Sequence, residues 1–530
     1  LPMKSISFLF LLVLILLQSS SALKFLCYSP RFATSHVNYL GKLADSLVDE
    51  GHEVAILSQI LDSRLKSAGS ERARVIEIPQ DDVGRAYEQG TMGDTRAAWY
   101  SGETWQALDS WAGMFDLWTA QCNTTINHPG LLNQLRAEKF DAAFGESMNW
   151  CMGGLFHLVG IKNFAVTESI ANKDGMYRIS QVPTASSYVP SIMGGSFGEE
   201  MTFTQRAFNL FNTIMYARFN YGSAPKYQEI FERNYPGFPD VVDLMALNSL
   251  FFLNSDPLVD FPRPSAARMI DIGGIAVSNG HGQLSVEWSS LLSLRPKTVF
   301  MSFGTFARAF AMPEEYKKTI RETARGMPDV TFIWKYEKPE DSVTQGIPNL
   351  VETTWAPQHE LLYDPRLSAF VTHCGAGSTT EANYAGVPLI VVPVTFDQIR
   401  NGFQVKRAGL GINLDKSELG RNGVFANAVK EVLENPKYKQ QAIATAAMLN
   451  DKPFTARQIF VRNMEFLAKH GPLRQLDHYG RHLNIFQFYL IDLIGAVILS
   501  AVFTVALVIF IVVKLLKCVI SKSRGKSKAE

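Results

Sequence analysis

Residues 370–401, FVTHCGAGSTTEANYAGVPLIVVPVTFDQIRN, place polar side chains and glycines between two apolar segments. The first apolar segment ends at His373, and Gly375 and Gly377 follow in a turn that leads into a helix-like segment. Free amide groups at the start of a helix attract anions, and glycine lets a phosphate approach the backbone closely. The pattern therefore predicts a phosphate site, to which His373 can also donate.

Ser378 and Glu381, just after the two glycines, allow two interpretations. Their spacing is that of a capping box, in which both side chains only close the start of a helix. In the second interpretation they contact the same ligand as the turn does. Cys374, beside His373, is interpreted as a packing residue without a catalytic role.

The two neighbouring loops carry side chains that suit the other parts of a nucleotide sugar. Trp355 and Gln358 offer an aromatic face and an amide to a flat base. Asp397 and Gln398, after the next apolar run, can accept from and donate to sugar hydroxyl groups. Successive strand ends thus supply ligands for a base, a phosphate and a sugar.

His36 is the candidate for proton transfer, because an imidazole titrates near neutral pH. It stands between the first predicted strand, KFLCYSP, and the first predicted helix, at the edge where a parallel sheet binds its ligands. A histidine at a helix start is often only a capping or surface residue, and the residues alone leave both interpretations open.

The elements that position these residues alternate between strand and helix, which predicts the α/β class. KFLCYSP, an amphipathic segment ending at Gly51, and HEVAIL form a parallel strand-helix-strand unit. The alternation restarts after residue 295 with KTVFMSFGT, VTFIWKY, LVETTW, LSAFVTHC, VPLIVVPV and GINL. Pro and Gly concentrate between the two halves, in residues 255–295. We predict two facing Rossmann-like domains with a cleft at the carboxyl ends of their strands.

Both ends of the chain carry apolar segments. ISFLFLLVLILL near the start, followed by QSSSA, is typical of a signal peptide. The uncharged segment Leu493–Val513 is long enough to cross a membrane, and the basic tail behind it predicts a cytoplasmic C-terminus. The predicted regions are a signal peptide (1–22), a first Rossmann-like domain (23–280), a second Rossmann-like domain (281–485), a transmembrane helix (490–513) and a cytoplasmic tail (514–530).

The net charge and the cysteine positions argue against nucleic acid and structural zinc as partners. The net charge is +1, with 51 basic and 50 acidic residues, so the chain lacks the basic excess of a nucleic-acid-binding protein. No C-x-x-C pair indicates zinc. Asn123 begins a glycosylation sequon, and Cys122 and Cys151 either form a disulfide or stay free and buried.

Aromatic residues are dense in the first half of the chain. Trp99, Trp105, Trp111, Phe115 and Trp118 are followed by FNLFNTIMYARFNY at 208–221. Core packing is the favoured interpretation, because aromatic side chains mostly build cores. An apolar acceptor pocket, or contact with a membrane surface, is the alternative.

The segment from Trp355 to Asn401 resembles the signature of the UDP-glycosyltransferases, in particular the membrane-anchored UDP-glucuronosyltransferases of animals. FPRP and GG in the linker, SFGT at 302–305, SH before the first helix and the terminal apolar segment extend the likeness to nearly the whole chain. The resemblance implies the GT-B fold, with the acceptor bound by the first domain and the UDP-sugar mostly by the second.

The same resemblance implies a role for each donor residue. Trp355 would stack on uracil, and Gln358 and Glu381 would bind base or ribose. The diphosphate would be held by Thr305, His373 and the amides near Gly375 and Ser378, and the sugar by Asp397 and Gln398. Gly377 departs from the family pattern, which often has Asn there, so Ser378 or a backbone amide must replace that contact.

The resemblance also implies a catalytic pair, with His36 as the base and an acidic residue to orient its ring. Glu146, at the end of FDAAFGES, is the matching residue, although the mammalian pattern has Asp. Asp141 at the start of that strand is the second candidate. The implied reaction inverts the sugar's configuration and needs no cofactor and no obligatory metal, since no D-x-D motif is present.

We therefore expect transfer of glucuronate, or of glucose, from a UDP-sugar to a hydroxyl group of a small hydrophobic acceptor. The alternative is a membrane-anchored protein that binds a nucleotide sugar or hydrophobic ligand without turnover. The tail, KSKAE, is similar to a dilysine retrieval signal, which predicts the endoplasmic reticulum membrane with both domains lumenal. Homo-oligomer formation is left open.

Overall fold

The computed structural model describes residues 22–90, 99–100, 104–171, 174–277, 282–305 and 307–526. The predicted signal peptide, apart from Ala22, and residues 527–530 lie outside this part of the chain. The chain divides into two compact units, Leu1–Leu476 and Asp477–Glu530.

The first sheet confirms the parallel unit predicted from the start of the chain. Within the described residues it has seven parallel strands in the order β3-β2-β1-β4-β5-β6-β7. Its strands are β1 (Lys24–Tyr28), β2 (Glu53–Gln59), β3 (Arg74–Ile78), β4 (Ala142–Glu146), β5 (Phe164–Glu168), β6 (Leu250–Leu253) and β7 (Met269–Asp271). The helices in this region are α2 (Thr34–Asp49), α3 (Asp82–Gly90), α5 (Thr104–Ile126), α6 (Leu131–Glu138), α7 (Cys151–Val159), α8 (Tyr177–Ser180), α9 (Phe203–Gly222), α10 (Ala224–Asn234) and α11 (Val241–Ala246).

The second sheet is also parallel, with six strands among the described residues in the order β10-β9-β8-β11-β12-β13. They are β8 (Lys297–Ser302), β9 (Val330–Lys335), β10 (Leu350–Thr353), β11 (Leu367–Thr372), β12 (Leu389–Val391) and β13 (Gly411–Asn413). The helices are α12 (Val286–Leu292), α13 (Glu314–Gly326), α14 (Gln358–Tyr363), α15 (Ala376–Ala385), α16 (Asp397–Arg407), α17 (Val424–Glu434), α18 (Pro436–Asn450) and the short 3-10 helices Ala309–Ala311, Pro339–Asp341 and Lys416–Gly420.

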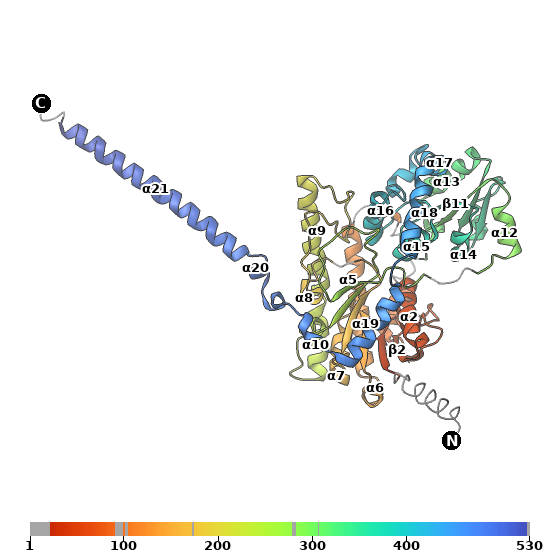
Figure 1. The fold of residues 1–530 in the computed structure, drawn as a ribbon, viewed down its shortest axis with the longest axis horizontal. Coiled ribbons are helices and arrows are strands. Elements are labelled where there is room, and N and C mark those ends of the chain that lie inside the picture. Colours follow the sequence, from red (N-terminus) through yellow and green to blue (C-terminus); the bar gives the residue numbers. More distant parts are fainter. Residues whose placement is uncertain are drawn as a thin grey trace, which may run out of the picture. The chain divides into compact units, whose positions relative to one another are not determined.

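Helix α19 (Ala456–His470) packs against the first sheet, although the predicted donor domain includes it. Its Phe460 meets Phe144 of β4 and Phe252 of β6 with ring centres 5.6 and 5.0 Å apart. Figure 1 shows this helix, in blue, beside α2, in red. The chain thus crosses from the second sheet back to the first, which ties the two sheets together.

The second unit contains the apolar helix that the sequence predicts. After the short helices Tyr479–His482 and α20 (Ile485–Phe488), helix α21 covers Ile491–Lys526. Its segment Ile491–Ile520 has a mean hydropathy of 3.1 and is long and apolar enough to cross a membrane. The predicted span, 490–513, lies almost wholly inside this helix.

Candidate active site

His36 and Glu146 meet at the carboxyl edge of the first sheet. Strands β1 and β4 are neighbours, so the loop after β1 and the last residue of β4 lie side by side. His36 sits in the first turn of α2, and its Nδ1 is 2.8 Å from Oε2 of Glu146. The glutamate side chain, longer by one methylene than the aspartate of the mammalian pattern, therefore reaches the ring.

Ser169, one residue beyond β5, completes this arrangement, and the sequence interpretation missed it. Its backbone N–H donates to Oε1 of Glu146 at 2.8 Å, and its Oγ lies 2.8 Å from Nδ1 of His36. Both Glu146 oxygens are thus engaged, and the side chain is only 4% exposed. With Nδ1 turned to the carboxylate, Nε2 becomes the nitrogen that can take a proton.

Asp141, the second candidate for the carboxylate, is at the opposite end of β4. Its Oδ2 accepts a hydrogen bond of 2.7 Å from the backbone N–H of Lys24, at the start of β1. The strand separates it from His36, so this alternative is wrong.

Aromatic side chains extend away from His36. Phe32 lies with its ring centre 4.7 Å from that of His36, and Trp118 of α5 meets Phe32 edge to face at 5.2 Å. Phe115 continues the series to Phe219 of α9, with ring centres 4.6 Å apart. These side chains form an apolar wall beside the candidate base.

The core-packing interpretation holds for some of the predicted aromatic residues and fails for others. Trp118 is buried in the core of the first sheet, whereas Trp99 packs on Phe303 near the second sheet. The side chains of Trp105 and Trp111 lie outside the described part of the structure. On α9 the core interpretation holds for Tyr221, which packs against the core of the first sheet, and fails for the exposed Phe208, Leu210, Phe211 and Ile214.

The predicted phosphate turn lies between β11 and α15. Gly375 takes the N-cap position, and α15 begins at Ala376. The imidazole of His373 packs against two glycines: a Cβ on Gly304 or on Gly375 would lie 2.6 Å from its Nε2. Glycine at these positions therefore makes room for the histidine ring. The exposed Thr305, next to Gly304, lies at the same edge.

The electrostatics of His373 favour a neutral ring. Burial, helped by the charge of Lys335, lowers the pKa of His373 to about 4. Lys335 Nζ donates to the carbonyl oxygen of Gly304 at 2.9 Å, which holds its positive charge beside the turn. The sequence interpretation did not include Lys335. A positive charge next to free helix amides strengthens the case for an anion site.

The capping-box interpretation of Ser378 and Glu381 is wrong. Gly375 is the N-cap and has no side chain to offer, and both polar residues bind Gln358 instead. Gln358 Nε2 donates to Ser378 Oγ at 3.2 Å and to Glu381 Oε2 at 2.6 Å. Burial raises the pKa of Glu381, and the bond from Gln358 acts in the opposite direction. Trp355, in the same loop as Gln358, is 66% exposed and presents a free face.

Asp397 and Gln398 begin α16, at the carboxyl end of the second sheet. Burial raises the pKa of Asp397, while Asn401, His36 and Arg400 act against that shift. Asn401 Nδ2 donates to Asp397 Oδ2 at 2.8 Å and to the carbonyl oxygen of Cys374 at 3.1 Å. One amide thus links the candidate sugar ligand to the candidate phosphate turn.

Gln398 is largely occupied by its own backbone. Its Oε1 accepts from the N–H groups of Val394 and Thr395 at 3.0 and 3.1 Å. These bonds support a turn in which Phe396 has a φ of 52°, a conformation that is costly for a residue with a side chain. A contact from Gln398 to a sugar would therefore come from Nε2.

The structure also gives the surroundings of Gly377 and of the predicted cysteines. Gly377 is exposed, and a Cβ there would meet no atom within 4 Å. Cys374 is buried with a φ of 66°, and burial raises its pKa to about 12, as expected of an inert thiol. Cys122 and Cys151 form a disulfide, which decides between the two interpretations of these residues. Among the described residues, no group of three His, Cys, Asp or Glu side chains could hold a metal ion.

Comparison with known proteins agrees with the resemblance. The Caenorhabditis elegans protein named "Putative UDP-glucuronosyltransferase ugt-48" is 29% identical, over 97% of this chain and 98% of its own length. UDP-glucuronosyltransferase 3A1 of Xenopus laevis is 27% identical, over 92% of both chains. UDP-glucuronosyltransferase 1A6 of Oryctolagus cuniculus is 25% identical, over 90% of this chain and 88% of its own.

A solved structure supports the fold. The glycosyltransferase of kitacinnamycin aligns with a TM-score of 0.56 at 17% identity, over 84% of this chain and 98% of its own. This likeness confirms the predicted GT-B arrangement of two parallel α/β sheets. The model of the UDP-glucuronosyl and UDP-glucosyl transferase family matches residues 26–529. The chain therefore belongs to this family and is a UDP-glycosyltransferase, an enzyme whose sugar donor is a UDP-sugar.

Proposed function

We propose that this enzyme transfers the sugar of UDP-glucuronate, or alternatively of UDP-glucose, to a hydroxyl group of a small hydrophobic acceptor. The single observation that carries the proposal is the His36–Glu146 pair, held by Ser169 at the carboxyl edge of the first sheet. An oriented imidazole next to an apolar wall is what deprotonation of a hydrophobic alcohol requires.

His36 acts as the general base in this proposal. Glu146 orients the ring through Nδ1 and stabilises the imidazolium that forms when Nε2 takes the acceptor's proton. The acceptor oxygen then attacks the anomeric carbon from the face opposite UDP, the bond to the diphosphate breaks, and the product is a β-glycoside. No covalent intermediate with the enzyme is needed.

The donor binds along the carboxyl edge of the second sheet. Trp355 stacks on uracil, and Gln358 and Glu381, already joined by a hydrogen bond, bind the base and ribose. Asp397 and Gln398 hold the sugar hydroxyl groups. The charge of His36 lowers the pKa of Asp397, which agrees with a proposed reaction centre shared by the sugar ligand and the base.

The leaving diphosphate is stabilised by the protein itself in this proposal. The free amides at the start of α15, Thr305 and the ring of His373 face it, and Lys335 adds positive charge from behind Gly304. Gly377 contributes no side chain, so Ser378 or the backbone amides supply the contact that the family pattern assigns to an asparagine at this position.

The remaining proposals concern location. We place the acceptor and donor domains in the lumen of the endoplasmic reticulum, anchored by α21, with the basic tail in the cytoplasm. Asn123, partly buried in the last turn of α5, is the candidate glycosylation site of the lumenal part. Removal of N-glycans from the expressed protein should increase its electrophoretic mobility, and Asn123→Gln should abolish that change.

A donor panel tests the proposed function. Membranes that contain the protein are incubated with UDP-glucuronate, UDP-glucose or UDP-N-acetylglucosamine and a phenolic acceptor, and the conjugates are identified by mass spectrometry. We expect one donor to give a β-linked product. His36→Ala should lower the rate by about 100-fold or more, because general base catalysis contributes about that much. His128→Ala, a histidine outside the site, is the matched control.

The outcomes separate the hypotheses. UDP binding without product from any donor would favour a protein that binds nucleotide sugars without turnover. Full activity of His36→Ala would show that the base has been assigned to the wrong residue.

A further inference from the structure

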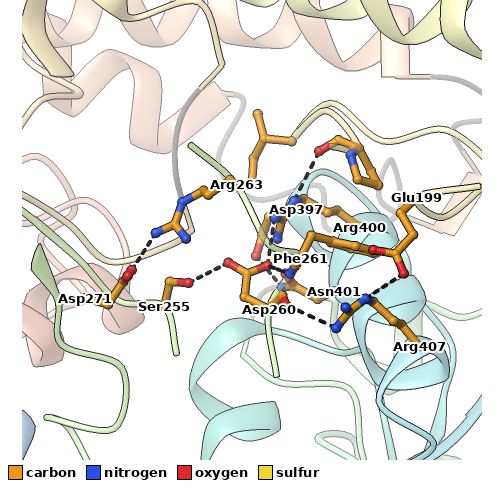
Figure 2. A network of polar contacts seen from close by, with 12 residues as sticks. Glu199, Ser255, Asp260, Phe261, Arg263, Asp271, Asp397, Arg400, Asn401 and Arg407 are labelled. Carbon is orange, nitrogen blue, oxygen red and sulfur yellow. Dashed lines mark hydrogen bonds and ion pairs between the residues drawn. The ribbon is translucent and has the colours of Figure 1, made fainter. Parts of the chain in front are cut away.

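Arg400 of α16 forms a buried ion pair with Asp260, a residue in the segment after β6. The guanidinium Nη2 and the carboxylate Oδ1 are 2.7 Å apart, and the two side chains are only 3% and 1% exposed (Figure 2). Taking two charges out of water costs several kcal/mol per ion, so such a pair persists only where its surroundings hold both partners. Here the backbone N–H of Phe261 donates to Asp260 at 2.7 Å, and Ser255 donates to its other oxygen.

The ion pair connects the two sheets. Arg400 belongs to the helix that follows β12 of the second sheet, and Asp260 follows β6 of the first. Arg400 Nε also donates to the carbonyl oxygen of Pro190 at 3.2 Å, in the loop between α8 and α9. Its guanidinium carbon lies 5.0 Å from the centre of the Phe261 ring. One side chain therefore holds two separate segments of the acceptor region (Figure 2).

The loop that contains Pro190 is itself fixed to α9. Asn209 accepts from the N–H of Ser191 at 2.8 Å and donates to the carbonyl oxygens of Ser186 and Val189. The backbone N–H of Ile192 donates to the buried Asp174 at 2.7 Å. A displacement of Arg400 would therefore be transmitted to an ordered part of the acceptor region.

The same helix begins with the proposed sugar ligand. Asp397 lies less than one turn before Arg400, and Asn401 holds both Asp397 and the carbonyl oxygen of Cys374. We propose that Arg400 and Asp260 are positioning residues: their ion pair fixes the start of α16, and with it Asp397 and the donor sugar, opposite His36. This inference rests on the proposed roles of Asp397 and His36.

Arginine is suited to this task in a way that lysine is not. Its planar fork makes the bond to Pro190 through Nε and the bond to Asp260 through Nη2 at the same time. The neighbouring Arg407 also crosses to the acceptor region, where it contacts Glu199 at 2.8 Å, but both side chains are about one third exposed. Water screens that pair, so Arg400 provides the main constraint.

The test is a double variant that removes both charges, Arg400→Gln with Asp260→Asn, because a single change would leave one buried charge unpaired. His52→Gln with Glu465→Gln removes another mostly buried polar contact, between the start of β2 and α19 of the first-sheet region, and serves as the matched control. UDP affinity, kcat for transfer, and the ratio of transfer to hydrolysis of the UDP-sugar are measured, together with hydrogen exchange of residues 186–200 and 397–407.

We expect the double variant to bind UDP within about threefold of the wild type, because the base and ribose ligands are on other elements. The kcat should fall by about 30-fold or more, since a misplacement of about 1 Å at a reaction centre can cost about 100-fold. Hydrolysis should gain relative to transfer, and exchange should accelerate in both segments. Arg400→Lys should give an intermediate kcat, and the control variant should keep the wild-type kcat.

A wild-type kcat and a wild-type transfer ratio in the double variant would overturn the proposal. It would also be overturned if kcat fell only in proportion to a loss of folded protein or of UDP affinity. If the wild type transferred no sugar, the proposed function would be wrong. In that case, unchanged hydrogen exchange of the two segments in the double variant would separately reject the positioning role.

Discussion

Glu146→Asp is the substitution that most directly tests the reaction centre. It installs the residue type of the mammalian pattern, yet we expect it to lower the kcat of this enzyme. Removing one methylene withdraws the carboxylate by about 1.5 Å. The distance of 2.8 Å between Oε2 and Nδ1 of His36 then becomes about 4.3 Å, which is beyond hydrogen-bond range.

The magnitude follows from the bond that is lost. A hydrogen bond to a charged group contributes about 1.5–3 kcal/mol, and about 1.4 kcal/mol corresponds to a factor of 10 in rate. The kcat should therefore fall by about 10- to 150-fold. Loss of the Ser169 N–H bond to Oε1 acts in the same direction, because the shortened carboxylate cannot satisfy both groups.

The assay is UDP release at saturating donor and acceptor, paired with UDP affinity as a measure of the intact donor domain. UDP affinity should not change, because Glu146 belongs to the first sheet. Asp141→Asn, at the opposite end of the same strand, is the control and should keep the wild-type kcat. A Glu146→Asp enzyme with a kcat within threefold of the wild type would refute the proposed role of the pair.

Three further substitutions test other parts of the structure. Asp397→Asn should abolish most transfer and yet raise the melting temperature at pH 7.5, by roughly 2–4 °C per kcal/mol of added stability. The reason is that burial raises the pKa of Asp397, so the wild-type fold loses stability as pH rises through that pKa. The gain, measured by differential scanning fluorimetry, should shrink toward pH 4, and an equal gain at both pH values would contradict this account. UDP binding should be accompanied by proton uptake at pH 5.5, because His373 is neutral with a pKa of about 4 and the diphosphate favours its charged form. Calorimetry in buffers of different ionisation enthalpy measures the number of protons taken up. His373→Gln should remove this proton uptake. Replacing Cys122 and Cys151 by Ser should lower the unfolding free energy by about 3–4 kcal/mol, since the disulfide closes a loop with a sequence separation of 29. Denaturant titration checks that value, and an unchanged midpoint would assign the bridge no stabilising role.

Much of the fold was predictable because doubly wound sheets follow from local patterns. Each predicted strand from KFLCY to GIN is a parallel strand, and most of them are buried. The carboxyl ends of parallel strands share one edge of the sheet. The grouping of Trp355, His373 and Asp397 at the second sheet follows from this rule alone, without any knowledge of contacts.

What the sequence did not reveal are contacts between residues far apart in the chain. Ser169 and His36 are separated by 133 positions, and no motif marks a serine that follows the strand FAVTE. Lys335 could not be predicted for the same reason, because it lies beside the phosphate turn through its hydrogen bond to the carbonyl oxygen of Gly304, in another strand-end loop. The capping-box interpretation of Ser378 and Glu381 failed because Gln358, from a different helix, competes for both side chains.

Asp397, at the start of α16, and Asp260, which pairs with Arg400 of the same helix, differ in how the fold affects their carboxylates. Asp260 is buried and Asp397 is partly buried. Burial raises the pKa of Asp397, whereas at Asp260 the charges of Arg400 and Arg263 and the hydrogen bonds from Ser255 and Phe261 together outweigh burial and lower the pKa. The folded state therefore loses stability at Asp397 as pH rises through its raised pKa. It gains stability at Asp260 above the unfolded value and loses it as pH falls through the lowered pKa. Near neutral pH the two effects therefore have opposite signs, because the ionised Asp397 lowers stability and the ionised Asp260 raises it. The carboxylate proposed to hold the sugar accepts a hydrogen bond from the amide of Asn401, while the neighbouring Arg400 makes its ion pair with Asp260 in the acceptor region. The ion pair of Arg400 therefore keeps α16 in place, while Asp397 at the start of the same helix stays available to a substrate.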